Sequence, residues 1–272
     1  MKLIFLDIDG TLTEPGTNVP PQSAVDAIRA ARAAGNRVFL CTGRNYAMLE
    51  PLLRYGFDGY VAGAGGYVVC ADELLYDCPM TQEQSGRVLS LLKENGIYRT
   101  IEARDASYCD AGTAEFMGRA AGNNSEAERW RRALEENLHI RPMEEYAGQP
   151  IYKVTFVCER REQLDPIRAA LDDEFNIVVQ DVFSRNSVNG ELINRKYDKG
   201  RGVRRIAEAL GVPLADTVGF GDSMNDLEMI ETVGTGVCMA NGSEALKRVS
   251  GMVCPAVGEN GIAEAFRTLK LV

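Results

Sequence analysis

Residues 3–11 read LIFLDIDGT, an apolar run followed directly by two acids and a glycine. Its four leading apolar residues are typical of a buried strand in a parallel sheet. Asp7 and Asp9 follow one residue apart, so a regular strand would direct both carboxylates to one side, and Gly10 permits a sharp turn after them. Two neighbouring acids need a cation or a proton between them. We predict a Mg²⁺ site with a carboxylate nucleophile; the plainer alternative is a solvated acidic turn.

Length and composition are those of a globular enzyme. The chain has 272 residues, with 45% hydrophobic and 25% charged residues, so a core domain with an insert is expected rather than one small core. The net charge of −9 argues against a broad nucleic-acid or anionic-membrane surface. A small anionic substrate remains compatible if the site carries its own cations.

The cysteines and the single histidine indicate the cellular compartment and limit which catalytic side chains are available. The seven cysteines contain no CxxC pair, which favours a reducing, cytoplasmic location, and no apolar stretch has the length of an export signal or a membrane span. The single histidine, His139, leaves little material for a Ser-His-Asp triad or a His-built zinc site. We expect catalysis by carboxylates, hydroxyls and lysine in a monomer or small homo-oligomer.

Strand and helix patterns alternate at both ends of the chain, which predicts an α/β fold with a Rossmann-like parallel-sheet core. Near the start the pattern predicts strands at Lys2–Leu6 and Arg37–Cys41 and helices at Pro21–Ala34 and Asn45–Tyr55. Near the end it predicts a helix at Gly200–Leu210, strands at Thr217–Phe220 and Thr235–Met239, and helices near Asn225, Ser243 and Ile262.

The middle of the chain has a different pattern, typical of an α+β insert. After a hairpin at Tyr67–Cys70 and Leu74–Tyr76, it predicts helices at Thr81–Asn95, Ser125–Asn137 and Arg161–Glu174, and strands at Tyr98–Glu102, Tyr152–Cys158, Ile177–Gln180 and Phe183–Val188. We therefore predict a core domain of residues 1–80 and 189–272 and an inserted cap domain of residues 81–188.

Three further segments share the position of the Asp7/Asp9 pair close to a strand or helix end. Thr42-Gly43-Arg44 follows one apolar strand, Asp222 to Asp226 follows another, and Lys199 precedes a helix. Ligands of open α/β sheets bind at the carboxyl edge, where these segments would meet. Together they supply the nucleophile, cation site, phosphate donors and acid that hydrolysis of a phosphate monoester requires. Taken singly, each has a plain alternative as a helix cap or an exposed lysine.

These four segments, in this order and spacing, resemble the four motifs of haloacid dehalogenase superfamily phosphatases. The insert resembles the α+β cap of the Cof-type sugar phosphatases, subclass IIB. The resemblance implies that Asp7 is the nucleophile that becomes an aspartyl phosphate and that Asp9 protonates the leaving oxygen and then activates water. It also implies that Thr42, the Gly43 amide and Lys199 hold the phosphoryl group.

The same resemblance implies the metal site. Mg²⁺ would be bound by Asp7, the backbone carbonyl of Asp9 and Asp222. Asn225 would help to bind the substrate, and both Asn225 and Asp226 would support the metal and the catalytic lysine from behind.

The chain departs from the family pattern at two places. Residues 62–66 read AGAGG where the family has an Asn-Gly pair, so a polar contact near the substrate entrance is expected to be missing. Asn241 lies in an altered form of a later family turn, and a simple turn asparagine is the favoured interpretation. The substrate would be selected by the cap, where the polar candidates are Glu102, Arg104, Asp105 and Lys153.

The predicted function is Mg²⁺-dependent hydrolysis of a small phosphate monoester, such as a sugar phosphate or related metabolite, through an aspartyl phosphate. One alternative is a phosphomutase, because Asp9 could serve transfer to a sugar hydroxyl as well as to water. Another is a non-catalytic phosphoryl-accepting or metabolite-sensing protein. The Thr42-Gly43-Arg44 form and the cap favour hydrolysis.

Overall fold

The computed structural model describes residues 1–113, 116, 140–180 and 187–272, and its contacts divide the chain into two compact units. The core unit contains residues 1–44, 49–77 and 197–272. The cap unit contains residues 78–196 together with Asn45–Met48. The predicted helix at Ser125–Asn137 lies outside the described residues, as does most of the predicted strand at Phe183–Val188.

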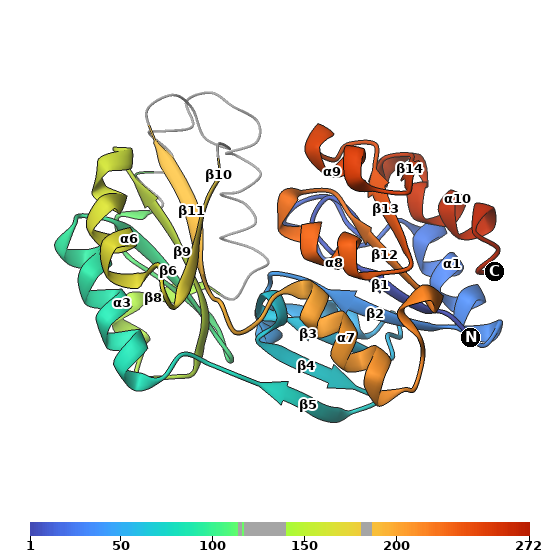
Figure 1. The fold of residues 1–272 in the computed structure, drawn as a ribbon, viewed down its shortest axis with the longest axis horizontal. Helices are drawn as coiled ribbons and strands as arrows, with labels where there is room; N and C mark the ends of the chain where they lie inside the picture. Colours follow the sequence, from blue (N-terminus) through green and yellow to red (C-terminus); the bar gives the residue numbers. More distant parts are fainter. Residues whose placement is uncertain (114–115, 117–139, 181–186) are drawn as a thin grey trace. The chain divides into compact units, whose positions relative to one another are not determined.

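An eight-stranded sheet forms the centre of the core unit, and its strand order is β14-β13-β12-β1-β2-β3-β4-β5 (Figure 1). The strands are β1 (Leu3–Leu6), β2 (Arg37–Cys41), β3 (Gly59–Ala62), β4 (Tyr67–Cys70), β5 (Glu73–Asp77), β12 (Thr217–Gly221), β13 (Thr235–Met239) and β14 (Met252–Cys254). Pairing is parallel from β14 to β3, and the hairpin of β4 and β5 continues the sheet antiparallel. The predicted α/β fold class is confirmed.

Helices cover both faces of this sheet, which explains the apolar runs in its central strands. The helices α1 (Gln22–Ala33) and α10 (Gly261–Thr268) pack on one face, against side chains such as Ile4 and Leu6. The helices α7 (Lys199–Ala209), α8 (Leu227–Thr232) and α9 (Glu244–Val249) pack on the other, against side chains such as Leu3 and Phe5. Because side chains alternate along β1, all four of these residues are fully buried.

The cap unit contains a six-stranded sheet with the order β10-β11-β9-β6-β7-β8. Its strands are β6 (Tyr98–Ala103), β7 (Ser107–Cys109), β8 (Ile140–Pro142), β9 (Ile151–Cys158), β10 (Phe175–Gln180) and β11 (Val188–Asn194). Two helices, α3 (Gln82–Glu94) and α6 (Asp165–Leu171), lie on one face of the sheet and share its apolar core (Figure 1). This is the α+β architecture expected for the insert.

One local prediction was wrong, and one strand was not predicted. The helix expected at Asn45–Tyr55 is a short 3₁₀ turn (Tyr46–Leu49) followed by the four-residue helix α2 (Glu50–Leu53), with Pro51 in its first turn. Strand β11 (Val188–Asn194) was not predicted, because Asn189, Gly190 and Glu191 interrupt any apolar run there.

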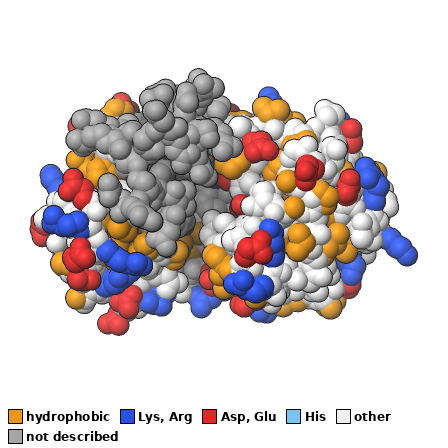
Figure 2. Space-filling view, turned by 90° about the horizontal axis from the view of Figure 1, so that it is seen from above, with side chains coloured by type: hydrophobic (Ala, Val, Ile, Leu, Met, Phe, Trp, Pro, Cys, Tyr) orange, Lys and Arg blue, Asp and Glu red, His pale blue; other side chains and the backbone are white. Residues whose placement is uncertain are grey.

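Charged side chains of both signs lie on the surface. In the face drawn in Figure 2, acidic and basic side chains are interspersed, with neither sign gathered into one large field. Among the described residues, no helix combines the length and apolar character that crossing a membrane would require.

Candidate active site

Three adjacent strands of the core sheet end at one edge and place the candidate residues there. Leu6 on β1 pairs with Leu40 on β2 and with Phe220 on β12. Asp7 directly follows β1, and its backbone NH donates to the Phe220 carbonyl at 3.0 Å. Thr42 follows β2 and Asp222 follows β12. Residues more than 200 positions apart therefore meet at the carboxyl edge, as the order of the motifs predicts.

An acidic cluster of Asp7, Asp222 and Asp226 occupies this edge. One carboxylate oxygen from each lies within 4.8 Å of the others. Asp226 is fully buried, and its Oδ2 accepts hydrogen bonds from the backbone NH groups of Asp222, at 3.0 Å, and Ser223, at 3.2 Å. Asp226 therefore fixes the loop that carries Asp222.

Two glycines allow the loops of the cluster to approach each other. Gly10 has a φ of +83°, and a Cβ there would lie 2.4 Å from Oδ2 of Asp222. A Cβ at Gly221 would lie 2.5 Å from Cγ of Asp226. A side chain at either position would therefore displace an acid of the cluster.

Lys199 is the buried cation of the site and the first residue of α7. Its Nζ lies 2.7 Å from Oδ1 of Asp7, 2.5 Å from Oδ1 of Asp226 and 3.3 Å from Oδ1 of Asn225. Asp198 caps the helix by accepting from the Arg201 NH. Burial lowers the pKa of Lys199, but Asp226 and Asp7 outweigh it and raise that pKa well above its ordinary value, so the ammonium stays charged.

The three carboxylates of the cluster carry more negative charge than the ammonium of Lys199 alone can offset. Burial raises the pKa of Asp7 well above its ordinary value despite the opposing effect of Lys199. Burial and the neighbouring Asp226 raise the pKa of Asp222 to about 7. Buried carboxylates with raised pKa values favour a further cation, and an all-oxygen set of ligands is the set that Mg²⁺ prefers. The residues present therefore fit a magnesium ion held by Asp7 and Asp222.

Asp9 lies apart from this cluster, with its side chain held by Arg44. The guanidinium binds both carboxylate oxygens, at 2.7 Å from Nε to Oδ2 and 2.6 Å from Nη2 to Oδ1, and Oδ1 also accepts from the Gly16 NH at 2.8 Å. Burial raises the pKa of Asp9, but the charge and hydrogen bonds of Arg44 outweigh burial and leave it below its ordinary value. In this arrangement Asp9 is an ionised hydrogen-bond acceptor.

Thr42 is fully enclosed at the end of β2. Its side-chain Oγ1 accepts from the Arg44 NH at 3.1 Å, and its carbonyl accepts from the Ala64 NH at 3.0 Å. Ala64 belongs to residues 62–66, where the Asn-Gly pair is missing, and has a left-handed φ of 56°. This conformation is one that asparagine and glycine adopt more readily than alanine.

Comparison with known proteins agrees with this geometry. A family model described as haloacid dehalogenase-like hydrolase matches residues 4–266. The chain belongs to this family. The phosphatase YwpJ of Bacillus subtilis is 28% identical over 99% of this chain and 100% of that protein. The pyridoxal phosphate phosphatase YbhA of Escherichia coli is 24% identical over 95% of this chain and 94% of that protein.

The solved structures of this haloacid dehalogenase-like family share the fold. The subclass IIB sugar phosphatase BT4131 superposes with a TM-score of 0.78 at 23% identity, covering all of both chains. The predictions of the family, of a core with an inserted cap, and of a phosphatase enzyme are confirmed by these comparisons. The roles of the individual site residues remain predictions.

Two residues of this haloacid dehalogenase-like site have contacts that sequence reasoning did not assign. Arg44 was part of a motif without a role, and the structure pairs it with Asp9. Asn241 donates from Nδ2 to the Gly10 carbonyl at 2.8 Å, so it holds the loop that carries the two N-terminal acids. Neither contact has a signal in spacing or composition, because each depends on how loops fold over the sheet edge.

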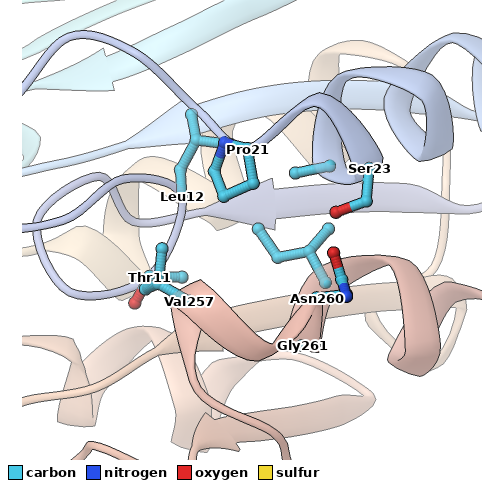
Figure 3. Close-up of a pocket in the computed structure, with 9 residues that line it drawn as sticks. Thr11, Leu12, Pro21, Ser23, Val257, Asn260 and Gly261 are labelled. Carbon is cyan, nitrogen blue, oxygen red and sulfur yellow. The ribbon is translucent and has the colours of Figure 1, made fainter.

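A shallow pocket lies behind this loop and contains none of the clustered acids (Figure 3). It is lined by Thr11, Leu12, Pro21, Ser23, Ala24, Val257, Asn260, Gly261 and Ile262. These residues come from the loop after β1, from the N-terminal ends of α1 and α10, and from the 3₁₀ turn (Val257–Glu259) that precedes α10. We place the candidate active site at the acidic cluster rather than in this pocket, because the cluster combines three carboxylates with the ammonium of Lys199, whereas no acidic or basic residue lines the pocket.

Proposed function

We propose that the chain hydrolyses small phosphate monoesters with Mg²⁺ and through an aspartyl phosphate on Asp7. The observation that carries the proposal is the contact of Asp7 with Lys199 inside an acidic cluster at the carboxyl edge of the core sheet. A buried carboxylate beside a fixed ammonium is a nucleophile already provided with a countercharge for the phosphoryl group.

The proposed reaction has two steps. In the first, an oxygen of Asp7 bonds to phosphorus, the bond from phosphorus to the ester oxygen breaks, and that oxygen takes a proton from Asp9. In the second, Asp9 accepts a proton from water, the water oxygen bonds to phosphorus, and the bond between phosphorus and Asp7 breaks to release phosphate. Each step transfers one proton and makes and breaks one bond to phosphorus.

The remaining residues bind and orient the phosphoryl group. Lys199 offsets negative charge on it and on Asp7, and Thr42 with the Gly43 amide holds its oxygens. Mg²⁺ bound by Asp7 and Asp222 would offset the charge between the nucleophile and the phosphoryl oxygens. Asn225, which accepts from both Lys199 and the Ser223 hydroxyl, orients the ammonium from the side of the substrate.

The substrate class follows from the relatives and from the charge of the site. Relatives across nearly the full length of the chain are named phosphatases of pyridoxal phosphate, of a phosphoribitylamino uracil and of phosphoglycolate. These compounds share a small organic group carrying one phosphate ester. We therefore propose a metabolite of this kind as the substrate and the cap unit as the source of specificity. All seven cysteines are free thiols, which supports a reducing, cytoplasmic setting.

Phosphate release from a panel of such esters, measured with added Mg²⁺ and again with EDTA, tests the proposal. We expect turnover of at least one ester that EDTA abolishes and Mg²⁺ restores. An ester that is isomerised without release of phosphate would instead indicate a mutase. A phosphorylated protein that persists for minutes without turnover would indicate a phosphoryl-accepting protein.

A further inference from the structure

The side chain of Arg44 is fixed so firmly that it determines where Asp9 lies. It is 6% exposed, and besides the two bonds to Asp9 it donates from Nη1 to Oδ1 of Asn18 at 2.7 Å and from Nη2 to the Thr17 carbonyl at 3.0 Å. The planar guanidinium therefore has contacts on its whole edge. A displacement of the Arg44 backbone that the torsions of its side chain do not absorb would move Asp9 or break this set of bonds.

Asn45, the residue after Arg44, belongs to the cap unit. Asn45 is 1% exposed, its Nδ2 donates to Oγ of the fully buried Ser107 at 3.0 Å, and its Oδ1 accepts from the Met48 NH at 3.1 Å. Met48 in turn packs against Ile140. Asn45 and its partners all belong to the cap unit, whereas Arg44 and Asp9 belong to the core unit.

One planar peptide bond thus joins a residue fixed in the core unit to a residue fixed in the cap unit. Consecutive Cα atoms stay about 3.8 Å apart across this bond, so a shift of Asn45 that rotation about the neighbouring φ and ψ angles does not absorb would reach Arg44. This matters for the proposed chemistry because both oxygens of Asp9 are occupied by donors in the observed arrangement. Among the described residues, Oδ2 accepts only the bond from Arg44 Nε, so the position of Arg44 determines how the free side of this oxygen faces a leaving group.

We infer that Arg44 is a positioning residue for Asp9 and that the Asn45–Ser107 hydrogen bond makes this positioning depend on the cap unit. The inference rests on the proposed function for the role of Asp9 as proton donor. The cap then has a second task besides contacting substrate: through Asn45 and Arg44 it helps to fix the position of the Asp9 side chain.

Leaving-group dependence tests the role of Arg44. We would measure kcat/KM, which reports departure of the leaving group, for aryl phosphates with leaving groups of graded acidity. For Arg44→Lys, which keeps the charge but loses the two-pronged contact, we expect a loss of about tenfold to a hundredfold with the least acidic leaving groups and less than about threefold with p-nitrophenyl phosphate. Equal losses, or no loss, across the series would overturn the positioning role.

Arg99→Lys is a matched control. Arg99 is a buried arginine of the cap unit that binds Asp110 with the same two-pronged geometry, at 2.8 Å from Nε and 2.7 Å from Nη2. Arg99→Lys is expected to lower the stability of the protein without changing how kcat/KM depends on the leaving group. A change in that dependence equal to the change in Arg44→Lys would show that the effect comes from weakened folding.

The coupling to the cap is tested by Ser107→Ala, with Ser107→Thr as the conservative variant that keeps the hydroxyl. We expect Ser107→Ala to lower kcat/KM about threefold to tenfold for the least acidic leaving groups only, Ser107→Thr to recover most of it, and the double variant Arg44→Lys/Ser107→Ala to be no worse than Arg44→Lys alone. Losses that multiply in the double variant would overturn the coupling.

A measurement without substrate separates this inference from the proposed function. Hydrogen exchange of the Arg44 Nε–H, followed by NMR and assigned by its disappearance in Arg44→Lys, reports the bond to Asp9 directly. We expect exchange at least about threefold faster in Ser107→Ala than in wild type and in Ser107→Thr. Unchanged exchange would overturn the coupling, whereas failure of wild type to hydrolyse any ester would overturn the proposed function alone.

Discussion

Oδ1 of Asp7 lies 2.7 Å from Nζ of Lys199, and the two side chains are only 6% and 1% exposed. The same ammonium contacts Asp226, whose side chain is fully buried. The ammonium of Lys199 is thus the shared countercharge of two carboxylates that are buried away from water. Removing one partner of such a buried set leaves an uncompensated charge, which costs more than the set contributes to stability when intact.

Replacement of Lys199 is therefore expected to weaken both folding and turnover. Lys199→Met should lower the free energy of unfolding by about 3 kcal/mol in EDTA, measured by urea denaturation, because Asp7 and Asp226 lose their shared countercharge. Lys199→Met/Asp226→Asn, which also removes one of the acids, should recover part of the loss. Unchanged stability in the single variant would mean that the ammonium is not the countercharge of these acids.

Asp7→Asn should abolish turnover while leaving the fold intact. The amide cannot form the proposed phosphoryl ester, so kcat is expected to fall by about a thousandfold or more. Circular dichroism and the unfolding midpoint would confirm folding. Asp26→Asn, which changes an exposed aspartate on α1, provides the comparison and should retain full activity. Activity of the Asp7 variant above a tenth of wild type would require a different nucleophile.

Asp9→Asn should slow the departure of poor leaving groups more than that of good ones. An amide cannot supply the proton, and general acid catalysis contributes about a hundredfold to ten-thousandfold when the leaving group is weakly acidic. The comparison is kcat/KM for an alkyl phosphate against p-nitrophenyl phosphate. Equal losses on both esters would remove Asp9 from the role of acid.

Stability of the metal-free protein should fall as the pH rises. The pKa of Asp222 is raised by burial and by Asp226 from its ordinary 3.8 to about 7 in the folded protein. The folded state therefore holds this proton more tightly than the unfolded state, and the difference is lost between those two pH values. Thermal unfolding in EDTA should give a lower Tm at about pH 8 than at about pH 5, since the carboxylate is then ionised without a cation.

Asp222→Asn should flatten this profile, because the amide does not titrate. Added Mg²⁺ should raise the Tm of wild type more at the higher pH and have little effect on the variant. A wild-type profile that is flat in EDTA, or that has the opposite slope, would contradict the raised pKa.

Ala64→Gly should stabilise the protein. Ala64 has a φ of 56°, and a non-glycine residue in this conformation costs about 1 kcal/mol or more. Glycine removes that strain, so the free energy of unfolding should rise by about 1 kcal/mol. Ala27→Gly, in the middle of α1, should lower it by a similar amount. Two changes of the same sign would exclude backbone strain as the cause.

The fold was predictable where a local sequence pattern is explained by the burial or position of that segment alone. The run at residues 3–6 predicts a strand buried on both faces, and helices do cover both faces of β1. The positions of Asp7, Thr42 and Asp222 after strands predicted that they would share a sheet edge, and the structure brings them together there.

Features that depend on tertiary contacts were not predictable in the same way. The polar residues of β11 give no apolar run, yet the strand forms because it pairs with β9 and β10 on both sides. The contact of Arg44 with Asp9 depends on the loop that contains Thr17 and Asn18, whose path no spacing rule describes. Membership of Asn45–Met48 in the cap unit rests on partners far along the chain.

Because of that short segment, the polypeptide passes between the two units four times rather than twice. Excising residues 78–196 and joining the cut ends with a linker would therefore not yield an intact isolated core. The truncated product would retain Asn45 and Met48 without Ser107 and Ile140, and would expose an amide and a thioether that are buried in the intact chain. Engineers who transplant caps between such scaffolds would need to exchange this tetrapeptide as well.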